Sequence, residues 1–386
     1  MNVFSKELLM ASSSGSKTVK EIKFRPTYGG GYTSWVLLDN GDLYSCGYNY
    51  YQGQTNDDSN PVLNFTKRAS NVDTVEPASS GTYYLTKSKE LWGCGRIDYY
   101  GHTSNTFVRI DTNVDLLSAG YDGMLYSKSG DVYSYGSDSG VLGTDAQKLI
   151  TAKVTTSGNG VQQEAYINTY GNLYMRGNGT YGQQANGSTS NSSTFIVRAT
   201  EAKDFIFPRF VAWYIRTNGY LYGCGIQYGG GSSSGNTTTF TAKDTDVVSV
   251  SASQDAYLYI KTNGELWGMG SDTAYVGSNN RQNKKRADNV ASVQIGDGSS
   301  YVTTNSDLYV IGYNNYGRFG NGTTSSSTTY TKVAEDVDKA FEAEGSLWYI
   351  DTNGELWGTG YNNAGQQGNG TTTNVLTFEN KMQYLT

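Results

Sequence analysis

Side chains that could carry out catalysis are scarce in this sequence. Histidine occurs once, at His102, which excludes any mechanism that needs two histidines. No serine or cysteine lies in the phrase of a nucleophile elbow, and no glycine cluster is followed by the Lys-Ser/Thr of a phosphate loop. The two carboxylates of a glycoside hydrolase need only converge in space, so the sequence does not exclude this class of enzyme. We predict that the chain is not an enzyme and uses no cofactor.

Acidic residues do not form a metal-binding pattern. Asp57 and Asp58 are adjacent, and Asp111, Asp115 and Asp122 lie near one another, but neither group fits the twelve-residue loop of a calcium site. We therefore predict no metal site.

Tyrosine is the residue type best suited to ligand binding here. Many tyrosines lie beside asparagine, glutamine and serine in the segments that follow a repeated glycine, where flat apolar rings join amide and hydroxyl groups. This chemistry suits sugar rings and adaptable protein interfaces, although packing between structural units would use the same rings. The candidate ligand-binding residues are Tyr48, Tyr50, Tyr51, Tyr99, Tyr100, Tyr181, Tyr228, Tyr313, Tyr316 and Tyr361.

A phrase that returns eight times along the chain positions these tyrosines. Each copy has a turn that often reads Asn-Gly, then an aliphatic residue, an aromatic residue, two variable positions and a glycine. The aliphatic residues are 41 to 48 positions apart: Leu43, Leu91, Val132, Leu173, Leu221, Leu266, Leu308 and Leu356. A repeat of this period indicates one closed repeat domain, since neighbouring copies bury a common core.

The glycine of the phrase comes four residues after the aliphatic residue in every copy. These structural glycines are Gly47, Gly95, Gly136, Gly177, Gly225, Gly270, Gly312 and Gly360. We expect them to let backbones approach where strands crowd near a central axis. The three cysteines, Cys46, Cys94 and Cys224, each precede this glycine directly, in a slot that methionine or isoleucine fills elsewhere. We interpret them as packing residues.

Each unit has the pattern of four strands. An apolar run precedes the turn, the Asn-Gly sequence favours a type I′ hairpin, and the Leu-Tyr or Leu-Trp strand follows. The aliphatic and aromatic residues then point to opposite faces, so that each packs against a different neighbouring unit. After a polar loop come two further strands, as in residues 195–197 and 247–250. Four strands in about 45 residues are typical of a β-propeller blade.

The order of hairpin, Leu-Tyr or Leu-Trp, spaced glycine and a loop with Asn and Gly-Gln resembles the repeats of the regulator of chromosome condensation family. The clearest copies run from Leu308 to Gly322 and from Leu356 to Gly370, and the resemblance covers about residues 25 to 380. The phage-encoded members are the most similar. The resemblance implies a propeller of seven blades, as in the family's named member, whereas the eight phrases here predict eight, with seven as the alternative.

The predicted fold is therefore all-β, a single β-propeller of four-stranded blades. Residues 21–386 form this domain, with eight repeats of about 41–48 residues, and residues 1–20 form an N-terminal leader or anchoring segment. We expect the two termini to close the ring by sharing one blade, because this fastens a propeller without a covalent bond.

Charge and hydropathy argue against two classes of partner. With 29 basic and 35 acidic residues, the net charge of −6 disfavours a polyanion-binding surface, so we expect no nucleic-acid partner. The sequence has no stretch of 18 apolar residues, so we expect no membrane span. The first 17 residues lack the basic start and the apolar run of a secretory signal.

A polar, turn-rich propeller of this kind predicts a non-enzymatic structural or binding component of a tailed-bacteriophage particle, in a fibre, the tail or a capsid decoration. In this interpretation the leader binds other virion proteins, and the propeller contacts a host-surface glycan or neighbouring virion proteins. The protein would reside in the virion. One alternative is a bacterial surface or secreted adhesin. Another, implied by the resemblance, is a guanine-nucleotide exchange factor, although this acidic chain lacks a basic N-terminal tail.

Overall fold

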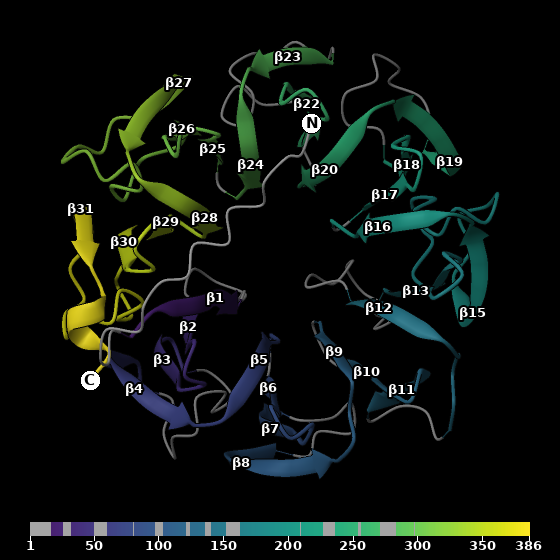
Figure 1. Ribbon diagram of the computed structural model, residues 1–386, viewed down its shortest axis with the longest axis horizontal. Helices are drawn as coiled ribbons and strands as arrows, with labels where there is room; N and C mark the ends of the chain where they lie inside the picture. Colours follow the sequence, from purple (N-terminus) through teal and green to yellow (C-terminus); the bar gives the residue numbers. More distant parts are fainter. Residues whose placement is uncertain are drawn as a thin grey trace, which may run out of the picture.

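The computed structural model is a ring of antiparallel sheets arranged around a central axis (Figure 1). It describes residues 17–25, 32–49, 60–79, 81–96, 103–120, 124–135, 140–151, 163–208, 210–226, 236–253, 256–270, 283–296 and 298–386. Each sheet consists of strands that are consecutive in the sequence, so each sheet is one blade. The ring has eight blades, which confirms the all-β propeller and the predicted blade number.

The strands follow one another from the axis outward in every blade. Blades 1 to 4 contain β1 (Val19–Arg25), β2 (Thr33–Leu38), β3 (Leu43–Gly47), β4 (Val62–Ala69); β5 (Val72–Pro77), β6 (Gly81–Thr86), β7 (Leu91–Arg96), β8 (Thr103–Asp111); β9 (Leu116–Ala119), β10 (Met124–Lys128), β11 (Asp131–Tyr135); and β12 (Ala146–Thr151), β13 (Glu164–Asn168), β14 (Leu173–Gly177), β15 (Ser192–Ala199). Blades 5 to 8 contain β16 (Ala202–Ile206), β17 (Val211–Arg216), β18 (Leu221–Gly225), β19 (Thr237–Asp244); β20 (Val247–Ala252), β21 (Ala256–Lys261), β22 (Leu266–Gly270), β23 (Lys284–Ala287); β24 (Val290–Ile295), β25 (Gly298–Thr303), β26 (Leu308–Gly312), β27 (Ser327–Ala334); and β28 (Val337–Ala343), β29 (Ser346–Asp351), β30 (Leu356–Gly360), β31 (Val375–Asn380). A short 3-10 helix, Met382–Tyr384, follows the last strand.

Blade 3 departs from the predicted four strands. Within the described part of this blade the sheet has three strands, and an isolated bridge between Val132 and Gly143 lies where a fourth strand would pair. This segment, residues 140–145, is short and has bends and a single bridge residue instead of a ladder.

The repeated phrase lies on the third strand of each blade, counted from the axis. In blade 1, Leu43 is buried in a cluster with Val72 and Val75 of the following blade, whereas Tyr44 is buried in a cluster with Trp348 of the preceding blade. The prediction that the two residues pack against different neighbours is confirmed. The same division recurs around the ring, with one buried cluster at each of the eight junctions.

Aromatic rings form a ladder across the blades. In blade 8, Tyr349 stacks on Trp357 with 6.0 Å between ring centroids and meets Phe378 edge-on at 4.9 Å. The same three-ring ladder recurs in blades 2, 4, 5 and 7. Offset stacks and edge-to-face contacts are the geometries that aromatic pairs prefer. The aromatic column of the repeat therefore stabilises the blades.

The described repeated glycines lie at the last residue of the third strand, or one residue before it at Gly95, and not on the strand nearest the axis, contrary to our expectation. Gly225 and Gly360 have φ values of +104° and +105°, which glycine adopts without strain. A Cβ on Gly225 would lie 2.8 Å from the Cα of Val211, and one on Gly360 would lie 2.7 Å from the Cα of Ser346. The glycine thus lets the third strand end against the start of the second. Gly136 lies outside the described residues.

The turn before the phrase also differs from the predicted type. In blade 1 the Gly41 N–H donates to the carbonyl oxygen of Leu38 at 2.9 Å, and Gly41 has a φ of +93° while Asn40 does not have a positive φ. A type I′ turn needs a positive φ at both central residues. The hairpin is instead a type I turn closed by a left-handed glycine, the usual geometry of a three-residue loop.

The ring closes where the first and last blades meet. Both ends of the chain take part, as predicted, since Lys17 Nζ donates to the carbonyl oxygen of Leu385 at 2.8 Å and the Val19 N–H donates to Gly354 at 2.9 Å. The ends do not share a blade, however, because β1 to β4 complete the first sheet and β28 to β31 complete the last. Closure depends on packing between two whole blades, where Trp348 is fully buried.

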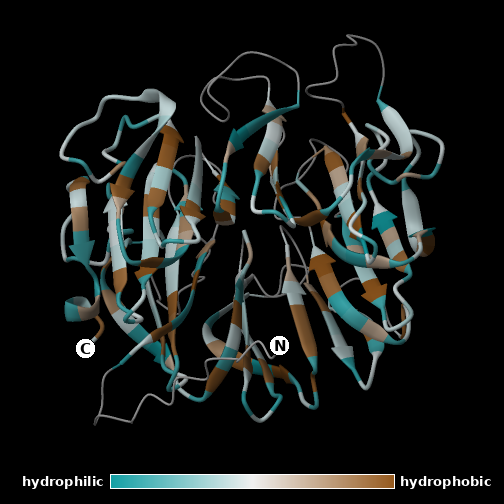
Figure 2. Cartoon of the chain, turned by 45° about the horizontal axis from the view of Figure 1, so that its top comes forward, coloured by the Kyte–Doolittle hydropathy of each residue, from teal (hydrophilic) through white to brown (hydrophobic). Residues whose placement is uncertain are grey.

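The innermost strands face the central axis (Figure 1), and apolar residues gather on the strands of the blades (Figure 2). Neighbouring inner strands are joined by ion pairs such as Lys20 with Asp73 at 2.8 Å and Lys23 with Glu76 at 2.5 Å. Of the predicted leader, residues 1–16 lie outside the described residues, and β1 begins at Val19. No helix of the described chain has the length and apolarity needed to cross a membrane.

Candidate functional site

The predicted tyrosines divide into three groups. Tyr50, Tyr51, Tyr99, Tyr100 and Tyr228 lie outside the described residues, as does His102. Two others are half-buried: the Tyr181 ring packs on Phe210 with 4.6 Å between ring centroids, and the backbone of Tyr48 bonds to the start of β2. The remaining three, Tyr313, Tyr316 and Tyr361, lie together at the junction of blades 7 and 8.

This junction is on one face of the ring, which we call the loop face. It consists of the loops that follow the third strands and the turns between the first and second strands, because these connections share one end of the antiparallel blades. The turns between the second and third strands lie on the opposite face. Tyr170, in the turn between β13 and β14, is on that opposite face and is 75% exposed.

Buried asparagines give the loops after β26 and β30 their shape. Asn314 Nδ2 donates to the carbonyl oxygens of Thr323 and Ser325 at 3.0 and 3.2 Å, and its Oδ1 accepts from the Phe319 N–H at 2.8 Å. Asn362 makes the equivalent bonds in the loop after β30, including one at 2.8 Å from the Gln367 N–H. One buried side chain thus satisfies several backbone groups that the loop would otherwise leave unpaired.

The same loops bind the outer strand of the following blade. The N–H groups of Gly187, Gly322 and Gly370 donate to Thr238, Leu376 and Leu63 at 2.8, 2.8 and 3.0 Å. Another glycine lies five residues before each of these, and a Cβ on it would come very close to the same outer strand. That Cβ would lie 2.5 Å from the Thr237 oxygen for Gly182, 2.9 Å from the Leu376 Cα for Gly317 and 2.7 Å from the Leu63 Cα for Gly365. We call these segments, residues 178–187, 313–322 and 361–370, the clasp loops.

Our sequence reasoning did not identify the clasp loops. The signal was present, since each has a glycine five residues after the phrase glycine and another five residues beyond, as in Gly312, Gly317 and Gly322. We predicted a recognition role for the tyrosines of these loops, and the structure adds that the glycines and asparagines of the same loops hold the ring together.

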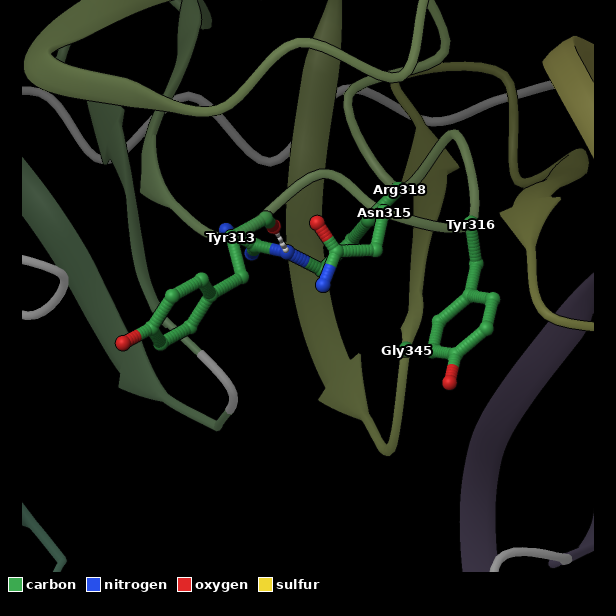
Figure 3. A pocket seen from close by; sticks show the side chains of 5 residues that line it. All are labelled: Tyr313, Asn315, Tyr316, Arg318 and Gly345. Atoms are coloured by element: carbon green, nitrogen blue, oxygen red, sulfur yellow. Dashed lines mark hydrogen bonds between the residues drawn. The ribbon is translucent and has the colours of Figure 1, made fainter.

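A hollow of about 130 Å³ opens between the clasp loop of blade 7 and the first turn of blade 8. It is lined by Tyr313, Asn315, Tyr316, Arg318 and Gly345. Figure 3 shows Tyr313 and Tyr316 on opposite sides of Asn315 and Arg318, with Gly345 beside Tyr316. Tyr313 is 49% exposed and Tyr316 is 41% exposed, so both rings border the solvent.

The base of the hollow is a buried ion pair. Arg318 Nη1 lies 2.6 and 2.8 Å from the two carboxylate oxygens of Glu342 on β28, and both side chains are 1% exposed. Arg318 also donates from Nη2 to the carbonyl oxygen of Ile311 at 2.6 Å and from Nε to that of Tyr313 at 3.1 Å. The guanidinium therefore fixes Tyr313 and joins blade 7 to blade 8.

Gly345 keeps the hollow open. Gly345 precedes Ser346, the residue that pairs with the repeated glycine Gly360 in blade 8. In blade 5 the repeated glycine Gly225 pairs with Val211, so Phe210 is the residue equivalent to Gly345. At that junction of blades 4 and 5, Phe210 fills the space beside Tyr181. Gly345 leaves this space empty, and its φ of +68° and the 2.7 Å from its Cβ direction to the Tyr316 ring both require glycine.

Tyr361 supports the hollow from the side of blade 8. Its ring lies 4.5 Å from that of Tyr316, which holds Tyr316 at the edge of the hollow. Burial raises the pKa of Tyr361 above its ordinary value, and the neighbouring Tyr316 hydroxyl raises that pKa further. The phenol is therefore neutral at physiological pH. A neutral aromatic wall above a compensated ion pair can bind a ligand, but it offers no nucleophile and no base.

The three cysteines are buried and not paired in disulfides. Burial raises the pKa of Cys224 to about 12, and Cys46 contacts the clasp loop of blade 8 through the Gln366 carbonyl oxygen at 3.3 Å. Their interpretation as packing residues agrees with these positions.

Comparison with solved structures supports an RCC1-like β-propeller fold. Human WBSCR16 superposes with a TM-score of 0.59 at 13% identity, over 89% of this chain and 94% of that one. Prp20p from Saccharomyces cerevisiae gives 0.51 at 14% identity, over 77% and 86%, and yeast RCC1 (Prp20) bound to Kap60 gives 0.52 at 11%, over 98% and 90%. Identities this low show the fold alone. No protein-family model and no curated protein matched the sequence.

Proposed function

We propose that this chain is a non-enzymatic binding propeller that contacts its partner through the loop face. The observation that carries the proposal is that residues of the clasp loop of blade 7 have two separate structural roles. Its Asn314 and Phe319 are buried and hold the ring, whereas Tyr313 and Tyr316 are exposed around a hollow. Exposed tyrosines on a rigid loop are favourable for binding, because little conformational entropy is lost when a partner contacts them.

Solved propellers of the same fold support a binding role. The yeast propeller Prp20p was studied for its binding to Gsp1p and histones, and the same propeller was solved in complex with Kap60. We extend from those proteins only the idea that one propeller presents a face to other macromolecules. A protein partner of this chain is therefore part of the proposal, beside a glycan.

We further propose that the binding occurs on a tailed-phage particle. The support is the composition, which is rich in tyrosine, glycine and polar residues, and the few charges of the chain. In this proposal the leader, residues 1–20, anchors the propeller to other virion proteins. Mass spectrometry of purified particles tests the location: the chain should co-purify with capsid or tail proteins, and its exclusive recovery from the bacterial envelope would favour the adhesin instead.

The loop face is tested by comparing matched tyrosine variants. We expect the double variant Tyr313→Ala/Tyr316→Ala to lose about tenfold or more in affinity for host envelopes or for particle proteins, while Tyr170→Ala on the opposite face keeps the affinity of the unaltered chain. Equal binding by all three proteins would refute the loop face as the recognition surface. Acceleration of guanine-nucleotide release by the chain would support the exchange-factor alternative instead.

A further inference from the structure

We propose that the hollow between Tyr313 and Tyr316 binds one neutral pyranose ring. This inference rests on the proposed binding function and names the ligand class for the same face. Four features carry it, namely the size of the hollow, its two exposed rings, its compensated charge, and its absence from equivalent junctions.

The size fits a single small ring. The hollow encloses about 130 Å³, well below the roughly 300–1,000 Å³ of sites that bury drug-sized ligands. A longer oligosaccharide would therefore place one residue in the hollow and extend along the loop face. The opening is not blocked, since Tyr313, Asn315 and Tyr316 are all exposed.

The walls have the chemistry that a sugar ring needs. A pyranose presents a flat face of C–H groups and a rim of hydroxyl groups, which match an aromatic ring and an amide. Tyr313 and Tyr316 supply the rings, and Asn315 lies between them (Figure 3). Tyr316 is held by Tyr361 and by the backbone of Gly345, so its ring is positioned before a ligand arrives.

The base of the hollow disfavours charged ligands of both signs. A cation, which two tyrosine rings could otherwise attract, would meet the Arg318 guanidinium. An anion would gain little from that guanidinium, because Glu342 already compensates its charge at 2.6 and 2.8 Å and two carbonyl oxygens accept its other bonds. The ligand that remains favourable is neutral and rich in hydroxyl groups.

Two other clasp loops fill the equivalent space with protein. At the junction of blades 4 and 5, Phe210 lies where Gly345 lies here and packs on Tyr181. At the junction of blades 8 and 1, the buried Tyr32 takes that position and Ala364 replaces Tyr316. Among the clasp loops that the structure describes, the one in blade 7 combines exposed tyrosines with an unfilled hollow.

Ligand-observed NMR tests the inference with methyl glycosides of glucose, galactose, mannose and N-acetylglucosamine as probes. We expect saturation transfer from the unaltered chain to the C–H face of at least one glycoside. Tyr313→Ala and Tyr316→Ala should each weaken that binding about tenfold. Tyr313→Phe, which keeps the ring, should retain more of that binding than Tyr313→Ala does. Tyr170→Ala, on the opposite face, should leave the binding unchanged. N-acetylneuraminic acid, which is anionic, should bind no better than the neutral glycosides.

The outcomes separate this inference from the function on which it rests. A glycoside that binds the tyrosine variants and the unaltered chain equally would refute the hollow as its site. If no glycoside binds but the loop-face variants still lose their affinity for envelopes or particle proteins, the binding propeller stands and the sugar ligand is refuted. If neither measurement changes, both proposals fail. Thermal unfolding of Tyr316→Ala, whose ring packs on Tyr361, distinguishes lost binding from lost folding.

Discussion

Replacing Glu342 by glutamine should destabilise the ring more than any change of a surface charge. The substitution keeps the shape of the side chain but leaves the Arg318 guanidinium buried without its counter-charge, since both side chains are 1% exposed. Breaking a buried pair in this way costs about 3–5 kcal/mol. An unfolding entropy of about 2.1 cal/mol/K per residue gives about 0.8 kcal/mol/K for 386 residues. The expected fall in Tm is therefore about 4–6 °C.

The chain itself supplies a matched rescue for this variant. Gln183 and Gln366 occupy the position of Arg318 in the other two clasp loops. The residues equivalent to Glu342 at those two junctions are Phe207 in blade 5 and Phe24 in blade 1. The Phe24 ring packs on Trp348 with 5.9 Å between ring centroids. Apolar replacement of a buried ion pair is often neutral or stabilising. We expect Arg318→Gln/Glu342→Phe to recover most of the stability that Glu342→Gln loses.

Thermal unfolding followed by circular dichroism measures both variants, and hydrogen exchange at β28 shows whether the loss is local to the junction of blades 7 and 8. Lys89→Gln is the control, because its pair with Asp115 is exposed and should contribute less than about 1 kcal/mol. The reasoning is refuted if Glu342→Gln unfolds at the same temperature as Lys89→Gln, or if the double variant is as unstable as the single one.

Three further predictions concern the repeat. Gly225→Ala should cost about 3 kcal/mol or more because its Cβ would collide with β17, whereas Gly187→Ala, with a φ of +79° and open space, should cost only about 1 kcal/mol in thermal unfolding. Burial raises the pKa of Tyr301 and of Tyr349 to about 12. The folded state thus favours the neutral phenol, so the stability that these two buried tyrosines contribute is complete below pH 10 and is lost as the pH rises towards 12. Absorbance at 295 nm should show phenolates appearing together with unfolding. Burial raises the pKa of Cys224 to about 12, so a thiol reagent at pH 8 should modify it only after denaturant is added.

Most of the fold was predictable from the sequence, because every copy of the repeated phrase packs in the same way. Leu43 and Tyr44 face different blades for the same reason that Leu356 and Trp357 do, so eight copies of one phrase predict eight junctions. Ring closure was not predictable in this way. The phrase says nothing about which strand begins the chain, and β1 completes the first blade without help from the C-terminus.

The candidate site was only partly predictable. Tyr313, Tyr316 and Tyr361 were among the candidates, but Gly345 and Glu342 belong to the following blade and come together with them only through the curvature of the ring. Arg318 was missed because its position holds glutamine in the other clasp loops, and a single exception to a repeat looks like variation in the sequence.

The clasp loops explain why function in this propeller is better sought in departures from the repeat than in the repeat itself. Some positions that hold the ring are alike in all three loops, such as Gly182, Gly317 and Gly365, because a Cβ there would meet the backbone of the next outer strand. Positions beside the hollow are unlike their equivalents at other junctions, since Tyr316 corresponds to Ala364 in the last loop, and Gly345 corresponds to Phe210 in blade 5. A substitution at the second kind of position changes the surface without opening a junction, so eight similar blades can carry one distinct site. The hollow beside Gly345 is such a departure, and the buried pair of Arg318 and Glu342 beneath it is another at the same junction.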